Sequence, residues 1–193
     1  MIHILVFDGF ADWEAAYALA ELRRWGRRTV VAVGFDALPV TSMGGLRVVP
    51  EATIYDVNPT ETEMLILPGG DLWEGTYPRV DLEALLNAFL ESGIPVAAIC
   101  GATLALARAG VLNHRQHTSN MPSYLTEHVP DYTGHTSYRE ELAVNDRGVI
   151  TASGLGPVEF AREIFKELGV FNPSDDQLWF DMFKHGHLPE RAV

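Results

Sequence analysis

The only cysteine of the chain has the neighbours that a nucleophile requires. Cys100 lies in the stretch VAAICGATLALARAG, residues 96 to 110, where a short apolar run passes directly into an Ala/Leu pattern. A nucleophile on a tight turn from a strand into a helix needs small residues around it, which Ala98, Gly101 and Ala102 provide. Because a helix N-terminus stabilises a thiolate, we expect the pKa of Cys100 to fall below its ordinary value of about 8.5. The alternative is a small buried hydrophobic residue, which is the commonest role of a free cysteine.

The elements that would position this cysteine alternate along the chain. Continuous apolar runs predict strands, and leucine-rich periodic segments predict helices between them. This alternation predicts a mostly parallel sheet covered on both faces, in which ligands bind at the carboxyl ends of the strands. The strands are expected at residues 2 to 7, 29 to 33, 64 to 67 and 95 to 99, and the helices at residues 13 to 25, 81 to 91, 102 to 109 and 157 to 168.

Shorter features complete the prediction of a single domain over residues 1 to 193. Pro68-Gly69-Gly70 follows one apolar run, and Cys100 follows the next. The two turns can form a shared pocket; the alternative is that Pro68-Gly69-Gly70 is only a tight turn. The tail, residues 173 to 193, is expected to be helical and to bury its aromatic residues on the domain or at a subunit interface. The remaining expectations are a hairpin or excursion within residues 40 to 53, a short strand at 116 to 119, and a hairpin of strands 141 to 144 and 149 to 152.

Composition excludes several classes of function. The net charge is −12 with only 14 Lys and Arg residues, which argues against binding to nucleic acid or to anionic membrane surfaces. The opening MIHILVFDGF has no basic leader, and Asp8 interrupts its apolar run, so we expect neither a signal peptide nor a spanning helix. One cysteine cannot form an internal disulfide, in agreement with a cytoplasmic protein. His185 and His187 lack further ligands at suitable spacing, so we expect no metal, and we expect no cofactor.

Four short motifs, in this order, resemble the ThiJ/PfpI family of the class I glutamine amidotransferase-like superfamily. They are FDGFADWE at 7 to 14, LILPGG at 65 to 70, AAICGATLALA at 97 to 107 and TASGLGPVEFA at 151 to 161. That family includes PfpI-type proteases, Hsp31-like glyoxalases and the Parkinson-associated deglycase protein. The resemblance runs from about residue 2 to about residue 168. It implies a flavodoxin-like three-layer α/β sandwich with a nucleophile elbow, and a homodimer.

The same resemblance implies a set of site residues. Cys100 matches the family's cysteine, and Glu14 matches an acidic residue of the first helix that hydrogen-bonds the thiol region. Gly69 and Gly70 match a turn whose N–H groups form part of an oxyanion-hole-like pocket, with the N–H of Gly101 as its partner. A Glu14 carboxyl held near the thiol would be protonated and donate a hydrogen bond to the sulfur. A solvated carboxylate on the helix surface is the alternative.

The histidines that related proteins use are missing. Gly101 occupies the position where PfpI-type proteases have a histidine, and Asn120 occupies the position of a histidine in deglycase-type members. An asparagine can orient a substrate but cannot act as a general base. His117 is a weaker candidate, because on a strand it would face the opposite side from Asn120. Glu159 lacks the histidine two residues before it that a glutamine amidotransferase needs, which argues against glutaminase activity.

These residues predict a cysteine-dependent hydrolase-like or lyase-like enzyme for a small carbonyl or amide substrate. Cys100 would be the nucleophile, Gly70 and Gly101 would hold the oxyanion, and Glu14 would manage a proton. Substrate contacts are expected from Gly69 and Asn120.

Two other classes of function fit the same sequence. The first is a non-enzymatic redox or stress sensor in which Cys100 is oxidised and an acidic partner stabilises the product. The second is an interaction protein that has kept the fold without its chemistry. For the enzyme, Trp13 and Trp73 are candidates for the walls of a small site.

Overall fold

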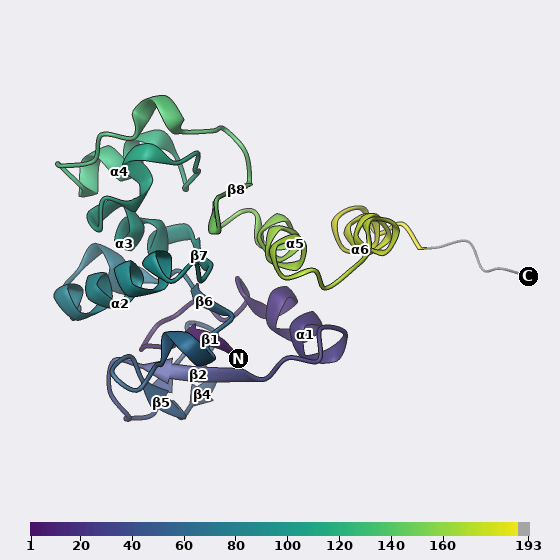
Figure 1. Ribbon diagram of the computed structural model, residues 1–193, viewed down its shortest axis with the longest axis horizontal. Coiled ribbons are helices and arrows are strands. Elements are labelled where there is room, and N and C mark those ends of the chain that lie inside the picture. Colours follow the sequence, from purple (N-terminus) through teal and green to yellow (C-terminus); the bar gives the residue numbers. More distant parts are fainter. Residues whose placement is uncertain (189–193) are drawn as a thin grey trace, which may run out of the picture.

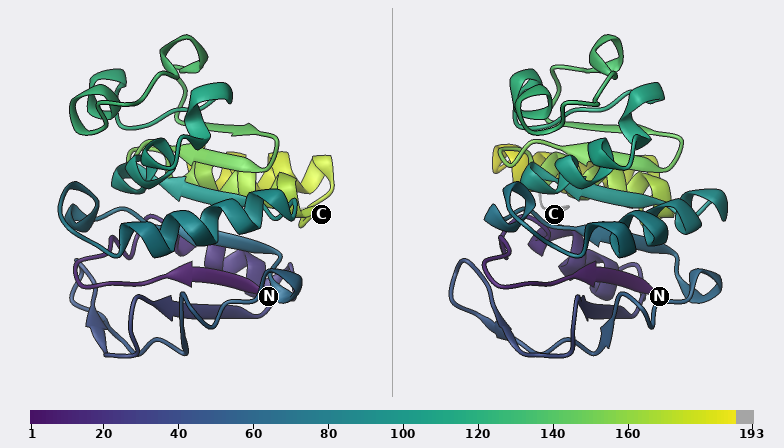
Figure 2. Two further views of the ribbon diagram at one scale, coloured as in Figure 1. Left: turned by 60° about the vertical axis from the view of Figure 1, so that its left-hand side comes forward. Right: turned by 90° about the vertical axis from the view of Figure 1, so that its left-hand side faces the viewer.

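Continuous apolar runs form the strands of a central sheet that helices cover on both faces (Figures 1 and 2). The computed structural model describes residues 1–188. The strand order is β5-β2-β1-β6-β7-β9-β8, and every neighbouring pair is parallel except β8 and β9. This confirms the predicted flavodoxin-like α/β sandwich with a mostly parallel sheet. The strands are β1 (Ile2–Leu5), β2 (Val30–Gly34), β5 (Ala52–Thr53), β6 (Met64–Leu67), β7 (Val96–Ile99), β8 (Ala143–Asp146) and β9 (Val149–Ala152).

The helices form two layers that enclose the sheet. Figure 1 shows α1, α5 and α6 on one side of the strands and α2, α3 and α4 on the other. Because both faces are covered, every residue of β1, β6, β7 and β9 is buried, which explains their unbroken apolar sequences. The helices are α1 (Ala16–Arg24), α2 (Arg79–Glu91), α3 (Thr103–Arg108), α4 (Pro122–His128), α5 (Pro157–Leu168) and α6 (Pro173–His185), and the 3-10 turns are η1 (Pro59–Glu61), η2 (Asp71–Glu74), η3 (Cys100–Ala102), η4 (Val111–His114) and η5 (His135–Ser137).

The segment at residues 40 to 53 forms the expected hairpin. Strands β3 (Val40–Thr41) and β4 (Arg47–Val48) pair in an antiparallel manner as a separate two-stranded sheet. Strand β5 then joins β2 at the edge of the main sheet.

The prediction of a short strand at residues 116 to 119 is wrong. Only His117 forms a bridge there, with Tyr138. The flanking N–H groups donate to side chains instead of to a strand ladder, from Gln116 to Asp146 Oδ2 at 2.7 Å and from Thr118 to Thr151 Oγ1 at 2.9 Å, and the His117 N–H donates to the Ser137 carbonyl at 3.3 Å. Strand β9 is already flanked by β7 and β8, so the segment is not paired with β9 either.

The hairpin of β8 and β9 turns later than expected. Strand β8 continues to Asp146, and the turn is formed by Arg147 and Gly148, whose φ angles are 53° and 75°. Two consecutive positive φ angles are typical of the two-residue turns that match the twist of a hairpin. Asn145, expected in the turn, lies in the strand and donates to Glu167 Oε2 at 2.8 Å.

The aromatic tail packs on the domain. Trp179 on α6 is buried, and its ring meets those of Phe165 on α5 and Tyr17 on α1 edge to face at 4.8 and 6.2 Å. Phe183 stays partly exposed beside them. Residues 189 to 193 of the predicted tail lie outside the described residues.

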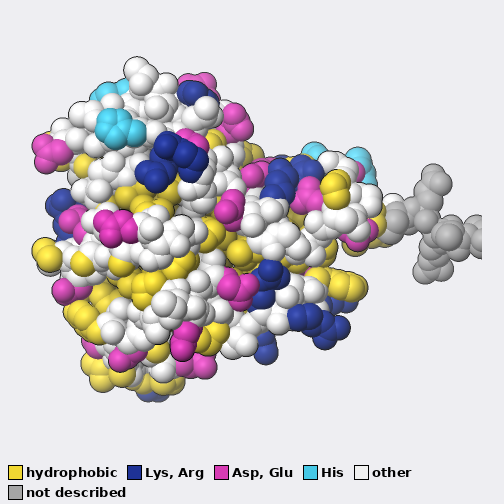
Figure 3. Space-filling view, viewed as in Figure 1, with side chains coloured by type: hydrophobic (Ala, Val, Ile, Leu, Met, Phe, Trp, Pro, Cys, Tyr) yellow, Lys and Arg dark blue, Asp and Glu magenta, His cyan; other side chains and the backbone are white. Residues whose placement is uncertain are grey.

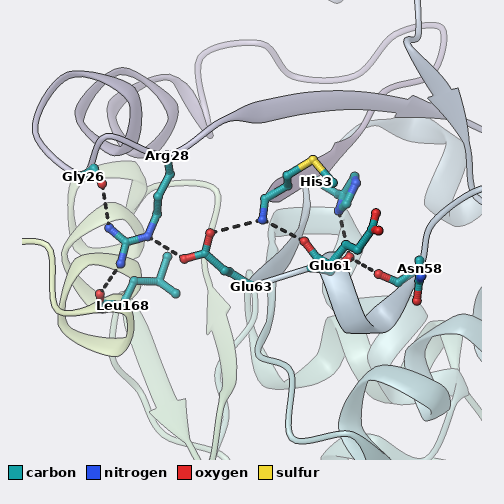
Figure 4. A network of polar contacts seen from close by, with 9 residues as sticks. His3, Gly26, Arg28, Asn58, Glu61, Glu63 and Leu168 are labelled. Carbon is teal, nitrogen blue, oxygen red and sulfur yellow. Dashed lines mark hydrogen bonds and ion pairs between the residues drawn. The ribbon is translucent and has the colours of Figure 1, made fainter.

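A polar network closes the sheet at the amino ends of its strands (Figure 4). Arg28 donates from Nε to Glu63 Oε2 at 2.9 Å and from Nη2 to the Leu168 carbonyl at 2.7 Å. The amino group of Met1 contacts the other oxygen of Glu63 at 3.1 Å. Arg28 thereby joins the start of β2 to β6 and satisfies a carbonyl at the end of α5. These contacts lie at the end of β1 and β6 opposite to the turns that carry Gly69 and Cys100.

Charged groups are unevenly distributed over the face shown in Figure 3. Basic side chains gather over α1, which carries Arg23 and Arg24 in its last turn and is followed by Arg27 and Arg28. None of the helices described within residues 1–188 combines the length and apolar character needed to cross a bilayer.

Candidate active site

Cys100 lies on a strained turn between β7 and α3. Strand β7 ends at Ile99, and the 3-10 turn η3 begins at Cys100 and leads into α3. The φ angle of Cys100 is 58°, in the left-handed region that side chains with a Cβ rarely adopt. Ala98, Gly101 and Ala102 are buried and leave room for this backbone. The expected strand-to-helix turn is therefore present, and it holds the thiol at the carboxyl end of the sheet.

The strain at this turn leads to a stability prediction. We expect Cys100→Gly to be more stable than Cys100→Ala by about 0.5–1 kcal/mol, because only the alanine keeps a Cβ at positive φ. Urea unfolding of the two variants measures the difference. An alanine variant as stable as the glycine variant would show that the turn is not strained.

Glu14 reaches the thiol from the turn that precedes α1. Glu14 is only 2% exposed, so it is not the solvated carboxylate on a helix surface that was the alternative. Its Oε2 accepts the Gly69 N–H at 2.6 Å, and its carboxyl group lies within hydrogen-bonding reach of the Cys100 thiol. Burial raises the pKa of Glu14 to about 7, against the opposing effect of these hydrogen bonds. Glu14 can therefore gain or lose a proton near neutral pH.

The expected lowering of the thiol pKa is wrong. Burial, followed by the negative charge of Glu14, raises the pKa of Cys100 to about 11. Helix α3 begins only at Thr103, so its terminus does not outweigh these two effects. The Asn120 amide and the Gly101 N–H both hydrogen-bond the sulfur and lower its pKa, but by less. The thiol and Glu14 are therefore a coupled pair, in which the proton stays on sulfur while Glu14 is ionised.

Asn120 contacts the sulfur from a second direction. Its Nδ2 donates to Cys100 Sγ at 3.4 Å, and its Oδ1 accepts the Gly154 N–H at 3.0 Å. Since Oδ1 is the only atom of this amide that can accept a hydrogen bond, the contact with Gly154 directs Nδ2 toward the sulfur. Asn120 therefore stabilises negative charge on sulfur.

Gly154 is a site residue that the sequence analysis missed. A Cβ at this position would lie 3.0 Å from Cys100 Sγ and 3.3 Å from Glu14 Oε1. The backbone after β9 therefore approaches both reactive groups so closely that a side chain here would require Cys100 or Glu14 to shift. Its only signal in the sequence is the glycine-rich SGLG that ends a predicted strand.

The three predicted glycines serve different purposes. The Gly69 N–H is taken by Glu14, so it is used within the protein, and a Cβ there would meet Glu14 Oε2 at 2.6 Å. Within residues 1–188 the Gly70 N–H has no protein acceptor. The Gly101 N–H faces the sulfur. Gly70 has a φ of 149°, and a Cβ on it would meet Phe7 Cε2 at 2.8 Å, so both geometry and space favour glycine.

His117 is not part of the site. Its ring is buried, with Nδ1 2.7 Å from the Arg115 carbonyl and Nε2 2.6 Å from the Tyr132 hydroxyl. Nδ1–H therefore donates to the carbonyl and Nε2 accepts from the tyrosine, which occupies both nitrogens. Burial also lowers the pKa of His117. It is a core histidine with satisfied hydrogen bonds.

The two tryptophans expected near the site have different environments. Trp73 is fully buried, and its Nε1 donates to the Pro68 carbonyl at 2.8 Å beneath the Pro68-Gly69-Gly70 turn. Its Cδ1 would lie 3.2 Å from a Cβ on Gly101. Trp13, next to Glu14, is 49% exposed. Trp73 therefore supports both glycine turns, whereas Trp13 lies at the surface.

Tyr124 is a further neighbour of the site with no signal in the sequence. Its hydroxyl oxygen would lie 3.3 Å from a Cβ on Gly101, and it donates to Glu74 Oε1 at 2.9 Å. His128 is beside both residues, with Nδ1 2.9 Å from the Tyr124 carbonyl and Nε2 3.9 Å from Glu74 Oε2. No group of three or more potential metal ligands occurs in the described part of the chain.

This arrangement defines an α/β protein centred on a cysteine, with a buried carboxyl group as the partner of the thiol. The chain belongs to the DJ-1/PfpI family, whose model matches residues 1–167. It is 38% identical over 190 residues to a Bacillus subtilis protein named "Uncharacterized protease YoaZ", covering 95% of this chain and 90% of that protein. It is 35% identical over 118 residues to a Thermococcus kodakarensis protein named a deglycase, covering 61% of this chain and 70% of that protein.

Solved structures agree with this membership. A DJ-1 superfamily protein from Agrobacterium tumefaciens is 38% identical with a TM-score of 0.89, covering 96% of this chain and 98% of that one. A thiJ/pfpI family protein from Bacillus anthracis is 35% identical with a TM-score of 0.89, covering 96% of this chain and 91% of that one. The expected family is thereby confirmed.

Proposed function

We propose that the protein is an enzyme in which Cys100 adds to a small carbonyl substrate and Glu14 accepts the thiol proton. The observation that carries this proposal is the buried carboxyl group of Glu14 within reach of the thiol. A general base works best when its pKa is near the working pH, and the pKa of Glu14 is raised to about 7. Glu14 thereby supplies the base that the missing histidines would otherwise provide.

The addition step balances with these groups alone. The thiol proton passes to the Glu14 carboxylate while the sulfur electron pair forms a bond to the carbonyl carbon. The carbonyl π electrons move to oxygen, and the N–H groups of Gly70 and Gly101 hold the resulting oxyanion. Glu14 then returns its proton to that oxygen, which gives a neutral hemithioacetal. Asn120 stabilises the sulfur at the moment when it is most negative, because its Nδ2 lies 3.4 Å away.

The raised thiol pKa favours this enzyme over the redox sensor. Oxidation proceeds through the thiolate, which is scarce near neutral pH when the pKa of Cys100 is about 11. A base-assisted attack needs no free thiolate, because the proton leaves as the new bond forms.

Turnover of a small 2-oxoaldehyde tests the proposal. We expect the wild-type protein to consume it, and Cys100→Ser to lose at least about 10³-fold in kcat/KM because a hydroxyl is a much weaker nucleophile. Mass spectrometry of the intact protein should show a reversible adduct on the wild-type chain alone. Equal turnover by both proteins would overturn the proposal.

A further inference from the structure

A second polar cluster borders the turn that carries Cys100 and takes no part in the proposed mechanism. It consists of Tyr124 on α4 and Glu74 at the end of η2, with His128 beside them. The Tyr124 hydroxyl would lie 3.3 Å from a Cβ on Gly101, the residue that follows the nucleophile. Helix α4 begins at Pro122, two residues after Asn120, whose amide contacts the sulfur. The hydroxyl of Tyr124 is therefore a near neighbour of any molecule bound to Cys100.

The direction of one hydrogen bond determines what this cluster offers. The Tyr124 hydroxyl donates to Glu74 Oε1 at 2.9 Å, because an ionised carboxylate can only accept. Burial, together with this bond and the charge of Glu74, raises the pKa of Tyr124, so the phenol keeps its proton. With its hydrogen engaged, the tyrosine oxygen presents only a lone pair to a ligand. It can accept a hydrogen bond from a ligand O–H or N–H group but has no hydrogen to donate.

Glu74 adds a negative charge to the same side of the site. Its side chain is 51% exposed, so its charge is felt in the solvent in front of the site as well as by Tyr124. Two cationic groups lie beside this cluster. His128 is 3.9 Å from Glu74 at the closest atoms and is charged only when protonated, whereas Arg108 lowers the pKa of Tyr124 but directs its Nη1 to the Trp73 carbonyl and the Tyr77 hydroxyl. A ligand carboxylate near Cys100 would therefore be repelled by Glu74 as well as by ionised Glu14.

We propose that Tyr124 and Glu74 select the substrate of Cys100. They favour uncharged or cationic carbonyl compounds that carry a hydroxyl, amino or amide hydrogen beside the reactive carbon, and they disfavour 2-oxo acids. This inference rests on the proposed function only in placing the substrate at Cys100. It assigns the two side chains a role in specificity, and the chemical step stays with Cys100 and Glu14.

Two alkylating reagents of matched shape test the selection without requiring turnover. Iodoacetamide and iodoacetate both form an S–C bond with loss of iodide, but the first carries amide N–H donors and the second a carboxylate. The rate constant of each with Cys100 is measured by intact-protein mass spectrometry, and their ratio is compared with the ratio for 2-mercaptoethanol. We expect Cys100 to prefer iodoacetamide by about three- to tenfold more than the free thiol does, a preference that salt reduces.

Variants separate the two residues. Glu74→Gln should bring the ratio of the iodoacetamide and iodoacetate rate constants most of the way to that of 2-mercaptoethanol. The difference that remains is the repulsion of iodoacetate by ionised Glu14. Tyr124→Phe should slow iodoacetamide more than iodoacetate. Glu127→Gln removes the same charge from an exposed position of α4 and should leave the ratio unchanged.

The possible outcomes are distinct. A ratio unaffected by Glu74→Gln, or lowered equally by Glu127→Gln, would overturn the inference, as would equal slowing of both reagents by Tyr124→Phe. Failure of the proposed function would appear differently. Cys100 would show the predicted preference for iodoacetamide, but the protein would not turn over carbonyl compounds.

Discussion

Glu14→Gln is expected to lower carbonyl turnover by about 10²–10⁴-fold while making the Cys100 thiol more acidic. The glutamine keeps the hydrogen bond from the Gly69 N–H but cannot accept the thiol proton. It also removes the negative charge that, after burial, does most to raise the pKa of Cys100. Chemistry and thiol acidity should therefore change in opposite directions, which a simple loss of folding would not produce.

Steady-state kinetics and the pH dependence of alkylation measure these two effects on the same protein. Asp12→Asn is the matched control, since it removes a carboxylate from the same turn that contacts Ser42 and Gly44 instead of the thiol. It should leave both quantities unchanged. An unchanged turnover in Glu14→Gln would mean that another group accepts the proton.

Gly69→Ala is expected to disrupt the site by adding one methyl group. The new Cβ would lie 2.6 Å from Glu14 Oε2 and 2.8 Å from the Cβ of Cys100, distances that real side chains do not show. Either Glu14 or the cysteine turn must move, so we expect turnover to fall by at least about 10²-fold and stability by about 1–3 kcal/mol.

Urea unfolding and kinetics of the variant test this expectation. Gly75→Ala provides the control, because a Cβ there would have only an ordinary contact, at 3.5 Å from the Leu72 carbonyl. Both glycines have backbone φ angles outside the positive range. Wild-type turnover in Gly69→Ala would show that the approach of Glu14 to Cys100 is not needed for activity.

Local sequence patterns were sufficient to predict the bounds of an element where those bounds depend on the residues of the element itself. The predicted bounds of β6, β9 and α5 coincide with the structure, because buried strands leave continuous apolar runs and an amphipathic helix leaves a periodic one. The prediction for the segment 116 to 119 failed because its polar groups bond to the side chains of Asp146 and Thr151 and to the Glu141 carbonyl instead of to a strand ladder.

In the site, too, local sequence predicted some features, whereas others depend on contacts across the fold. The small residues around Cys100 predicted the turn, but the thiol pKa was predicted in the wrong direction because sequence shows a helix start and does not show burial. Glu14 was assigned through family resemblance, since nothing in its own segment indicates that it meets the 69–70 turn. Gly154 and Tyr124 are defined by close approach across the fold, which single-sequence patterns do not record.

The pH dependence of Cys100 alkylation by iodoacetamide tests the central claim, that Cys100 and Glu14 share a proton, most directly. For the wild-type protein we predict two steps, a rise up to about pH 7 as Glu14 ionises and a second rise toward about pH 11 as the thiol itself ionises. Between them the rate should flatten, because the small population with the proton on Glu14 and the charge on sulfur stays constant. Glu14→Gln should show a single rise. A single rise of identical shape in both proteins would contradict the account.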